Sequence, residues 1–151
     1  MAEPEMRIGI ITDWKVGSPI IVKGHHNNVD FENNGTVLHI EPNSILRYSH
    51  LSSVSRLPDK AENYTMIEFR LARTEENSTS LNVRISNFPT ESIFKHWEFY
   101  WRITIEVVKR FIESTQQAQG RLCGTRFVEF GKPQVLRLRA GTFRNRCREN
   151  R

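Results

Sequence analysis

The sequence lacks the long apolar run that a membrane-spanning helix needs, about 18 residues or more. Met1–Ile11 also lacks the apolar stretch of a signal peptide. Cysteine is scarce, since Cys123 and Cys147 are the only two, and they show neither a CxxC spacing nor partnered histidines. We read them as reduced thiols, with a single disulfide as the alternative. These absences predict a soluble, cytoplasmic protein without a zinc site.

Catalytic signatures are absent as well. No nucleophile elbow, P-loop, HExxH motif or dinucleotide fingerprint occurs. His25 and His26 fall in a predicted loop, where adjacent residues provide no fixed ligand geometry, so we predict no metal site and no cofactor. His50 shares a predicted strand face with Tyr48, as an acid–base pair would, although a half-buried, hydrogen-bonded histidine is the commoner arrangement. We predict no catalytic residue and no enzymatic activity.

Charge is present but unevenly placed. Residues 1–120 carry 13 basic and 15 acidic residues, whereas residues 121–151 carry 9 basic and 2 acidic residues. At 151 residues, with 38% hydrophobic residues, the chain can build one modest core. We therefore predict one globular domain over residues 1–119, followed by a basic tail over residues 120–151.

Three interpretations of this tail stay open: a disordered or weakly structured segment, a short hairpin added at the edge of the sheet, or the product of an altered reading frame. Phe127, Phe130 and Phe143 lie among its basic residues, a mixture that can bind phosphates and stack on unpaired bases. No nucleic-acid-binding fold accompanies them, so we do not predict a nucleic-acid partner.

Segments of alternating polarity recur before residue 90. The clearest is Tyr64–Ala72, in which Ile67, Phe69 and Leu71 alternate with more polar neighbours. The other predicted strands are Met6–Trp14, Ile20–Lys23, Gly35–Ile40, Ile45–Ser52 and Leu81–Ile85. The polar segments His25–Asn34 and Leu51–Asn63 predict loops. Because parallel pairs need long crossovers, these connections predict an antiparallel meander of about six strands.

The apolar period changes after Pro89, and Thr90 is placed as an N-cap. Apolar residues then recur at spacings of three and four: Phe94, Trp97, Trp101, Ile105, Val108, and Phe111 or Ile112. This pattern predicts one long amphipathic helix that ends near Gln116–Gly120. Its aromatic stripe requires a large apolar partner, and the concave face of the sheet is the candidate.

Three stretches carry a family resemblance: Thr12–Gly24 (TDWKVGSPIIVKG), Gly35–Pro42 (GTVLHIEP) and Ser44–Ser49 (SILRYS). Together with the terminal aromatic helix, they resemble the START-like (SRPBCC) superfamily. The branch is the one homologous to the C-terminal domain of the activator of heat-shock-protein-90 ATPase. The resemblance runs from about Met6 to Glu113. It implies the α+β helix-grip fold, in which a curved antiparallel sheet wraps around one long C-terminal helix.

The resemblance also implies a function. The usual site of the family is a cavity between sheet and helix, which binds a hydrophobic small molecule or lipid without chemistry. Its lining residues in this sequence would be Trp14, Ile20, Leu38, Leu46, Tyr48, Phe69, Leu81, Val83, Trp97 and Trp101. An alternative is a protein-interaction module that stimulates a chaperone ATPase in the stress response, and a third is a polyketide-cyclase-like enzyme.

The family order begins with a strand and two helices upstream of the segment that corresponds to Met6. We therefore expect an N-terminally truncated domain, with one sheet edge unpaired and part of the apolar face open. Such an edge favours self-association.

Overall fold

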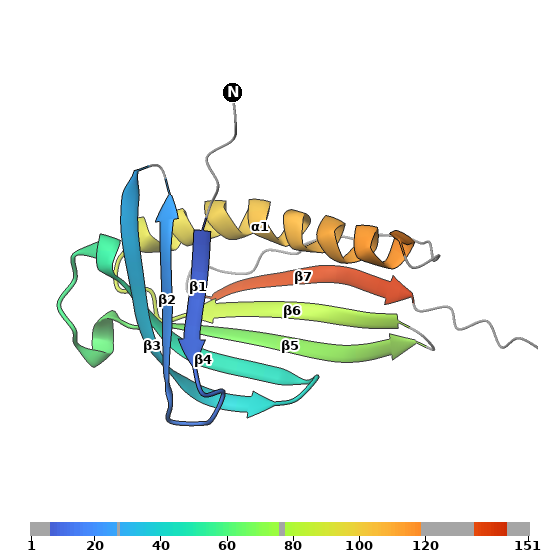
Figure 1. Ribbon diagram of the computed structural model, residues 1–151, viewed down its shortest axis with the longest axis horizontal. Helices are drawn as coiled ribbons and strands as arrows, with labels where there is room; N and C mark the ends of the chain where they lie inside the picture. Colours follow the sequence, from blue (N-terminus) through green and yellow to red (C-terminus); the bar gives the residue numbers. More distant parts are fainter. Residues whose placement is uncertain (1–6, 27, 76–77, 119–134, 145–151) are drawn as a thin grey trace, which may run out of the picture.

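The computed structural model describes residues 7–26, 28–75, 78–118 and 135–144. The strands form one antiparallel sheet in the order β1-β2-β3-β4-β5-β6-β7, so each strand lies beside its neighbour in sequence (Figure 1). Their bounds are Arg7–Thr12 (β1), Pro19–His26 (β2), Val29–Glu41 (β3), Ile45–Ser52 (β4), Thr65–Glu75 (β5), Ser78–Ser86 (β6) and Val135–Arg144 (β7). Two short 3-10 helices, η1 (Ser53–Ser55) and η2 (Ala61–Asn63), join β4 to β5.

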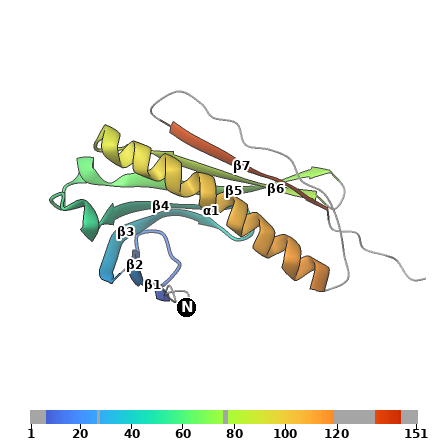
Figure 2. The same ribbon diagram turned by 90° about the horizontal axis from the view of Figure 1, so that it is seen from above.

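One long helix, α1 (Glu91–Ala118), lies across one face of this sheet (Figure 2). The Thr90 hydroxyl accepts a hydrogen bond from the Ile93 backbone N–H at 3.2 Å, as the predicted N-cap requires. Glu91 in the first turn pairs with Lys95 at 2.8 Å. The curved antiparallel sheet with one C-terminal helix confirms the predicted α+β helix-grip architecture.

The core lies where α1 crosses β5 and β6. Ile67, Val83 and Ile85 are fully buried, and they pack with Trp101 and Ile105 from the helix. Ile67 stands directly opposite Ile85 in the antiparallel register, so the two strands present one continuous apolar surface. This is the alternation that the sequence predicted, now assigned to the helix-facing side.

The apolar stripe of α1 departs from the prediction near its C-terminal end. Phe111 is 70% exposed, whereas Lys109 is only 8% exposed. At 100° per residue, Lys109 lies about 40° around the helix from Ile105, but Phe111 lies about a third of a turn away. Helix geometry therefore places the lysine stem on the buried side, although its residue type argues for the surface.

The predicted loop over residues 25–34 is wrong. β2 and β3 pair through this region down to His26 opposite Val29, which leaves a two-residue hairpin turn, and Asn28 has a φ of +61°. Its polar residues pair across the strands: Lys23 with Glu32 at 2.9 Å and His25 with Asp30 at 2.7 Å. Cross-strand ion pairs stabilise exposed strands, and composition alone does not reveal them.

The predicted tail falls only partly within the described residues. Residues 135–144 form β7, which pairs with β6 from Val135 opposite Ser86 to Arg144 opposite Ser78. Residues 119–134 and 145–151, with both cysteines, Phe127 and Phe130, lie outside the described residues. The boundary at residues 119 and 120 therefore stays a prediction.

Two irregularities bend β3, the strand that curves between the two parts of the sheet (Figure 1). The register shifts between Val37 and His39, a β-bulge. Gly35 approaches β4 so closely that a side-chain Cβ would collide with the backbone carbonyl oxygen of Ser49. The Ser49 hydroxyl in turn accepts a hydrogen bond from the Thr36 N–H at 2.9 Å, so no buried donor is lost at the bend.

We predict that Gly35→Ala lowers the free energy of unfolding by at least about 2 kcal/mol, because β3 or β4 must shift to admit the methyl group. Gly9→Ala is the matched control, since nothing lies within 4 Å of the added Cβ there. We expect it to change stability by less than about 0.5 kcal/mol. Urea unfolding followed by tryptophan fluorescence measures both, and equal stability of the two variants would contradict the assigned close approach.

Candidate functional site

Aromatic rings gather where α1 crosses β4 and β5. Trp97 and Trp101 stack with ring centroids 6.3 Å apart, Trp101 contacts Phe69 at 5.7 Å, and Phe69 stacks on Tyr48 at 6.3 Å. The His50 ring meets Trp97 edge-on at 4.9 Å. Tyr100 contacts Trp101 at 6.1 Å and completes the group. We call these residues the aromatic cluster: Tyr48, His50, Phe69, Trp97, Tyr100 and Trp101.

Strand alternation and helix periodicity explain this convergence. Tyr48 and His50 lie on the same side of β4, and Tyr48 stands opposite the core residue Ile67. Trp97 and Trp101 are one helical turn apart, so they cover neighbouring positions on the sheet. Strand alternation and helix periodicity therefore place both sets of rings at the interface between α1 and the sheet.

The structure brings together only part of the predicted lining. Tyr48, Phe69, Trp97 and Trp101 belong to the aromatic cluster, and Leu81 and Val83 lie beside it in the core. Leu46 is half-buried on β4 and stands opposite Phe69, at the border of the cluster. The other three are placed elsewhere: Trp14 is exposed between β1 and β2, Ile20 is buried on β2, and Leu38 lies at the bulge of β3. Whether any of them contacts a ligand stays a prediction.

Tyr100 was missed as a site residue. It lies off the regular stripe, next to Trp101 in sequence, and is 43% exposed. Its ring contacts those of Trp97 and Trp101, with centroids 6.4 and 6.1 Å away. The excess of aromatic residues in Trp97–Trp101 was the available signal, but it does not show which side of the helix they occupy.

The cluster is uncharged at neutral pH. Burial raises the pKa of Tyr48 to about 12, with a smaller contribution from Tyr100. Burial lowers the pKa of His50 to about 4, so its imidazole is neutral. The phenol and the imidazole can each donate or accept a hydrogen bond, but neither carries a charge that would attract a bound molecule.

Two buried polar atoms of the described residues have no hydrogen-bond partner: Trp101 Nε1 and Asn33 Oδ1. Asn33 stands opposite Val22 and Ser52, on the same side of the sheet as the aromatic cluster. Buried polar groups normally have a hydrogen-bond partner, so two unpaired atoms on the helix-facing side are unusual.

Beyond the cluster, exposed apolar side chains continue on the sheet. Ile8 and Ile10 of β1 lie on the helix-facing side, with Ile10 opposite Val22. We call these two residues the open apolar surface; they are 50% and 55% exposed. Phe99, Ile103 and Val107 of α1 are exposed as well, but each lies about 160° around the helix from a core residue, on the side turned away from the sheet. Figure 2 shows that α1 runs above β4 and β5 and leaves β1 and β2 uncovered.

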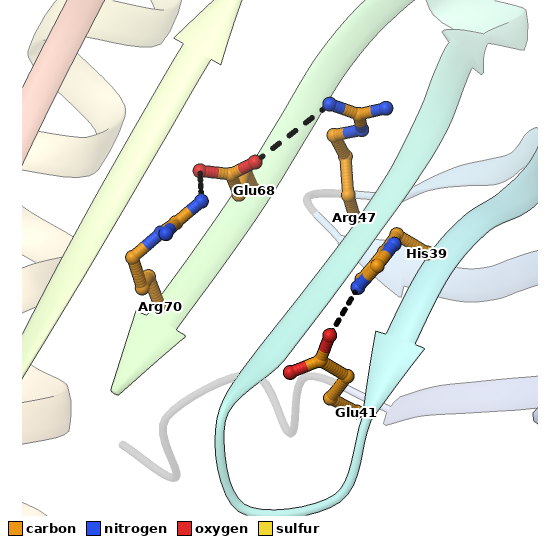
Figure 3. Close-up of polar contacts among 5 residues, drawn as sticks. All are labelled: His39, Glu41, Arg47, Glu68 and Arg70. Atoms are coloured by element: carbon orange, nitrogen blue, oxygen red, sulfur yellow. Dashed lines mark hydrogen bonds and ion pairs between the residues drawn. The ribbon is translucent and has the colours of Figure 1, made fainter. Parts of the chain in front are cut away.

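The opposite face of the same strands is charged. Glu68 on β5 pairs with Arg70 at 3.3 Å and with Arg47 of β4 at 3.9 Å, and His39 pairs with Glu41 at 3.0 Å on β3 (Figure 3). These polar side chains neutralise one another in part and remain solvated. The exposed apolar side chains of β1 and the aromatic cluster thus lie on the face opposite to these charges.

No three His, Cys, Asp or Glu side chains of the described residues are grouped as a metal site would require. Likewise, α1 is not apolar enough to cross a membrane over its described length.

The pKa of His50 predicts a pH dependence of stability. The ordinary pKa is 6.5 and the folded value is about 4, so the unfolded chain binds the proton more readily between these values. Lowering the pH from 6.5 to 4 should therefore reduce the free energy of unfolding by about 3 kcal/mol from this group. Urea unfolding at several pH values measures the loss, which His50→Phe should remove while keeping the contact with Trp97.

His96→Gln, at an exposed histidine of α1, is the control and should leave the pH dependence unchanged. A midpoint near 6.5 for the His50 ring in an NMR titration of the folded protein would show that the site is hydrated, against the prediction.

Comparison with known proteins identifies the family. The model described as "Activator of Hsp90 ATPase homolog 1-like protein" matches residues 7–113, from β1 through most of α1. A protein from Cytophaga hutchinsonii with a known solution structure is 33% identical; the match covers 73% of this chain and 75% of that protein, with a TM-score of 0.57. No curated protein sequence matches the chain. The chain therefore belongs to the family of proteins that resemble Activator of Hsp90 ATPase homolog 1.

Proposed function

We propose that this protein binds an apolar small molecule or lipid on the helix-facing side of the sheet, at the open apolar surface and the aromatic cluster. The observation that carries the proposal is that Ile8 and Ile10 are exposed on the side of the sheet that also holds the half-buried rings of the aromatic cluster. Exposed apolar area on a protein surface can mark a binding site. The START-like family membership supports the same use of this face.

Burial of apolar area would drive binding. Each Å² of ligand and protein surface removed from water contributes roughly 25 cal/mol before the costs of association are subtracted. Half-buried rings such as Tyr48 and Trp97 can add surface to the contact at little conformational cost, because they are already held by stacking.

Binding without chemistry is part of the proposal. Tyr48 and His50 are the polar side chains nearest to an acid–base pair, and burial keeps both neutral. No described side chain provides the third group that would orient His50 as a base. The polyketide-cyclase-like alternative has no observation of its own in its favour.

We predict that the neutral fluorescent probe N-phenyl-1-naphthylamine binds the protein with a saturable rise in emission. Ile10→Ser should weaken binding about threefold to tenfold, because it removes apolar area from the open apolar surface. Val54→Ser is the matched control, since Val54 is similarly exposed, at 59% against 55% for Ile10, but lies on η1. Absence of saturable binding, or equal loss in both variants, would contradict the proposal.

Self-association is the competing use of the same surface, because β1 is an edge strand with exposed isoleucines. Sedimentation velocity with and without the probe separates the two. A dimer that the probe does not dissociate, and that leaves no probe bound, would assign the surface to a second copy of the chain.

Stimulation of a chaperone ATPase is the second candidate function, and the family description supports it. This activity would make the protein a cytoplasmic regulator in the stress response. The measurement is the rate of ATP hydrolysis by purified Hsp90 with increasing amounts of this protein. A rise that Ile10→Ser leaves intact would separate this function from ligand binding.

A further inference from the structure

The indole N–H of Trp101 is an unused donor in the interior. The residue is only 8% exposed, and no described residue accepts a hydrogen bond from Nε1. An indole nitrogen can only donate. A donor that is buried without a partner is destabilising, so the folded protein gains free energy when an acceptor reaches it.

The neighbours of this donor are rings. Trp101 is enclosed by Phe69, Trp97 and Tyr100, with centroids 5.7 to 6.3 Å away. Of these, Tyr100 is the most exposed, so the rings around Trp101 meet solvent mainly at Tyr100.

The surroundings of Trp101 Nε1 also disfavour a charged ligand group. Tyr48 and His50 are both neutral, so a charged ligand group would lose its water without gaining a counter-ion. The buried cation of α1, Lys109, lies eight residues from Trp101, about 12 Å along the helix. A carboxylate bound at Trp101 would be beyond its reach.

We propose that the ligand is an uncharged apolar molecule whose carbonyl or ether oxygen accepts a hydrogen bond from Trp101 Nε1. This inference rests on the proposed function and adds the chemical class of the ligand. Apolar contact with the rings of the aromatic cluster supplies affinity, and the single donor selects molecules with an oxygen acceptor over hydrocarbons of the same shape.

Three naphthalene probes of similar size test this inference: 2-acetylnaphthalene, 2-ethylnaphthalene and 2-naphthoate. Their dissociation constants are measured by ¹H–¹⁵N NMR titration of the intact chain, in which the indole resonances are assigned from single Trp→Phe variants. We expect the ketone to bind about fivefold more tightly than the hydrocarbon. The carboxylate should bind most weakly, and only the ketone should move the Trp101 indole proton downfield.

Trp101→Phe should bring the affinities for ketone and hydrocarbon to within about twofold, because the ring remains but the donor is lost. Trp97→Phe is the matched control: it should lower both affinities to the same degree and so keep their ratio. Equal binding of the two neutral probes to the wild type would overturn the inference while leaving the proposed function in place.

Tightest binding of 2-naphthoate would also overturn it and would indicate that a cation governs recognition. If no probe binds while the spectrum remains dispersed, the proposed function itself fails. Retention of the ketone preference in Trp101→Phe would assign recognition to another donor and contradict the role given to Trp101.

Discussion

The packing of Trp101 and Ile105 of α1 against Ile67, Val83 and Ile85 is the contact on which the rest of this structure depends. A sheet or an amphipathic helix alone leaves one apolar face in water, and each is stable here because it covers the other. The core is small and lies over β5 and β6. Its position determines where α1 can lie, and therefore which part of the sheet stays uncovered.

Because α1 packs off-centre, the helix-facing side of the sheet is covered in one part and exposed to solvent in another. Under the helix, aromatic rings from α1, β4 and β5 pack together, and Trp101 Nε1 is one of the buried polar atoms of the described residues that have no partner. Towards β1, apolar side chains of the same face remain exposed. The face therefore combines a buried hydrogen-bond donor in its covered part with apolar area in its uncovered part.

Sequence reasoning located four of the six residues of the aromatic cluster. Tyr48, Phe69, Trp97 and Trp101 follow strand and helix periodicities strongly enough to be assigned to one interface. The rest of the predicted lining came from the family's usual cavity and does not lie in the aromatic cluster. Tyr100 escaped prediction because it lies off the regular stripe, and period alone does not reveal its contacts with Trp97 and Trp101.

The sequence by itself determined the antiparallel meander, the start of α1 at the Thr90 cap and the aromatic stripe, because alternation, capping and period are local properties. Only the tertiary structure decided the pairing of His26 with Val29, the close approach at Gly35 and the burial of Lys109. Each of these depends on a partner from another strand or on a helix face chosen by packing. Residue type carries little information about such partners.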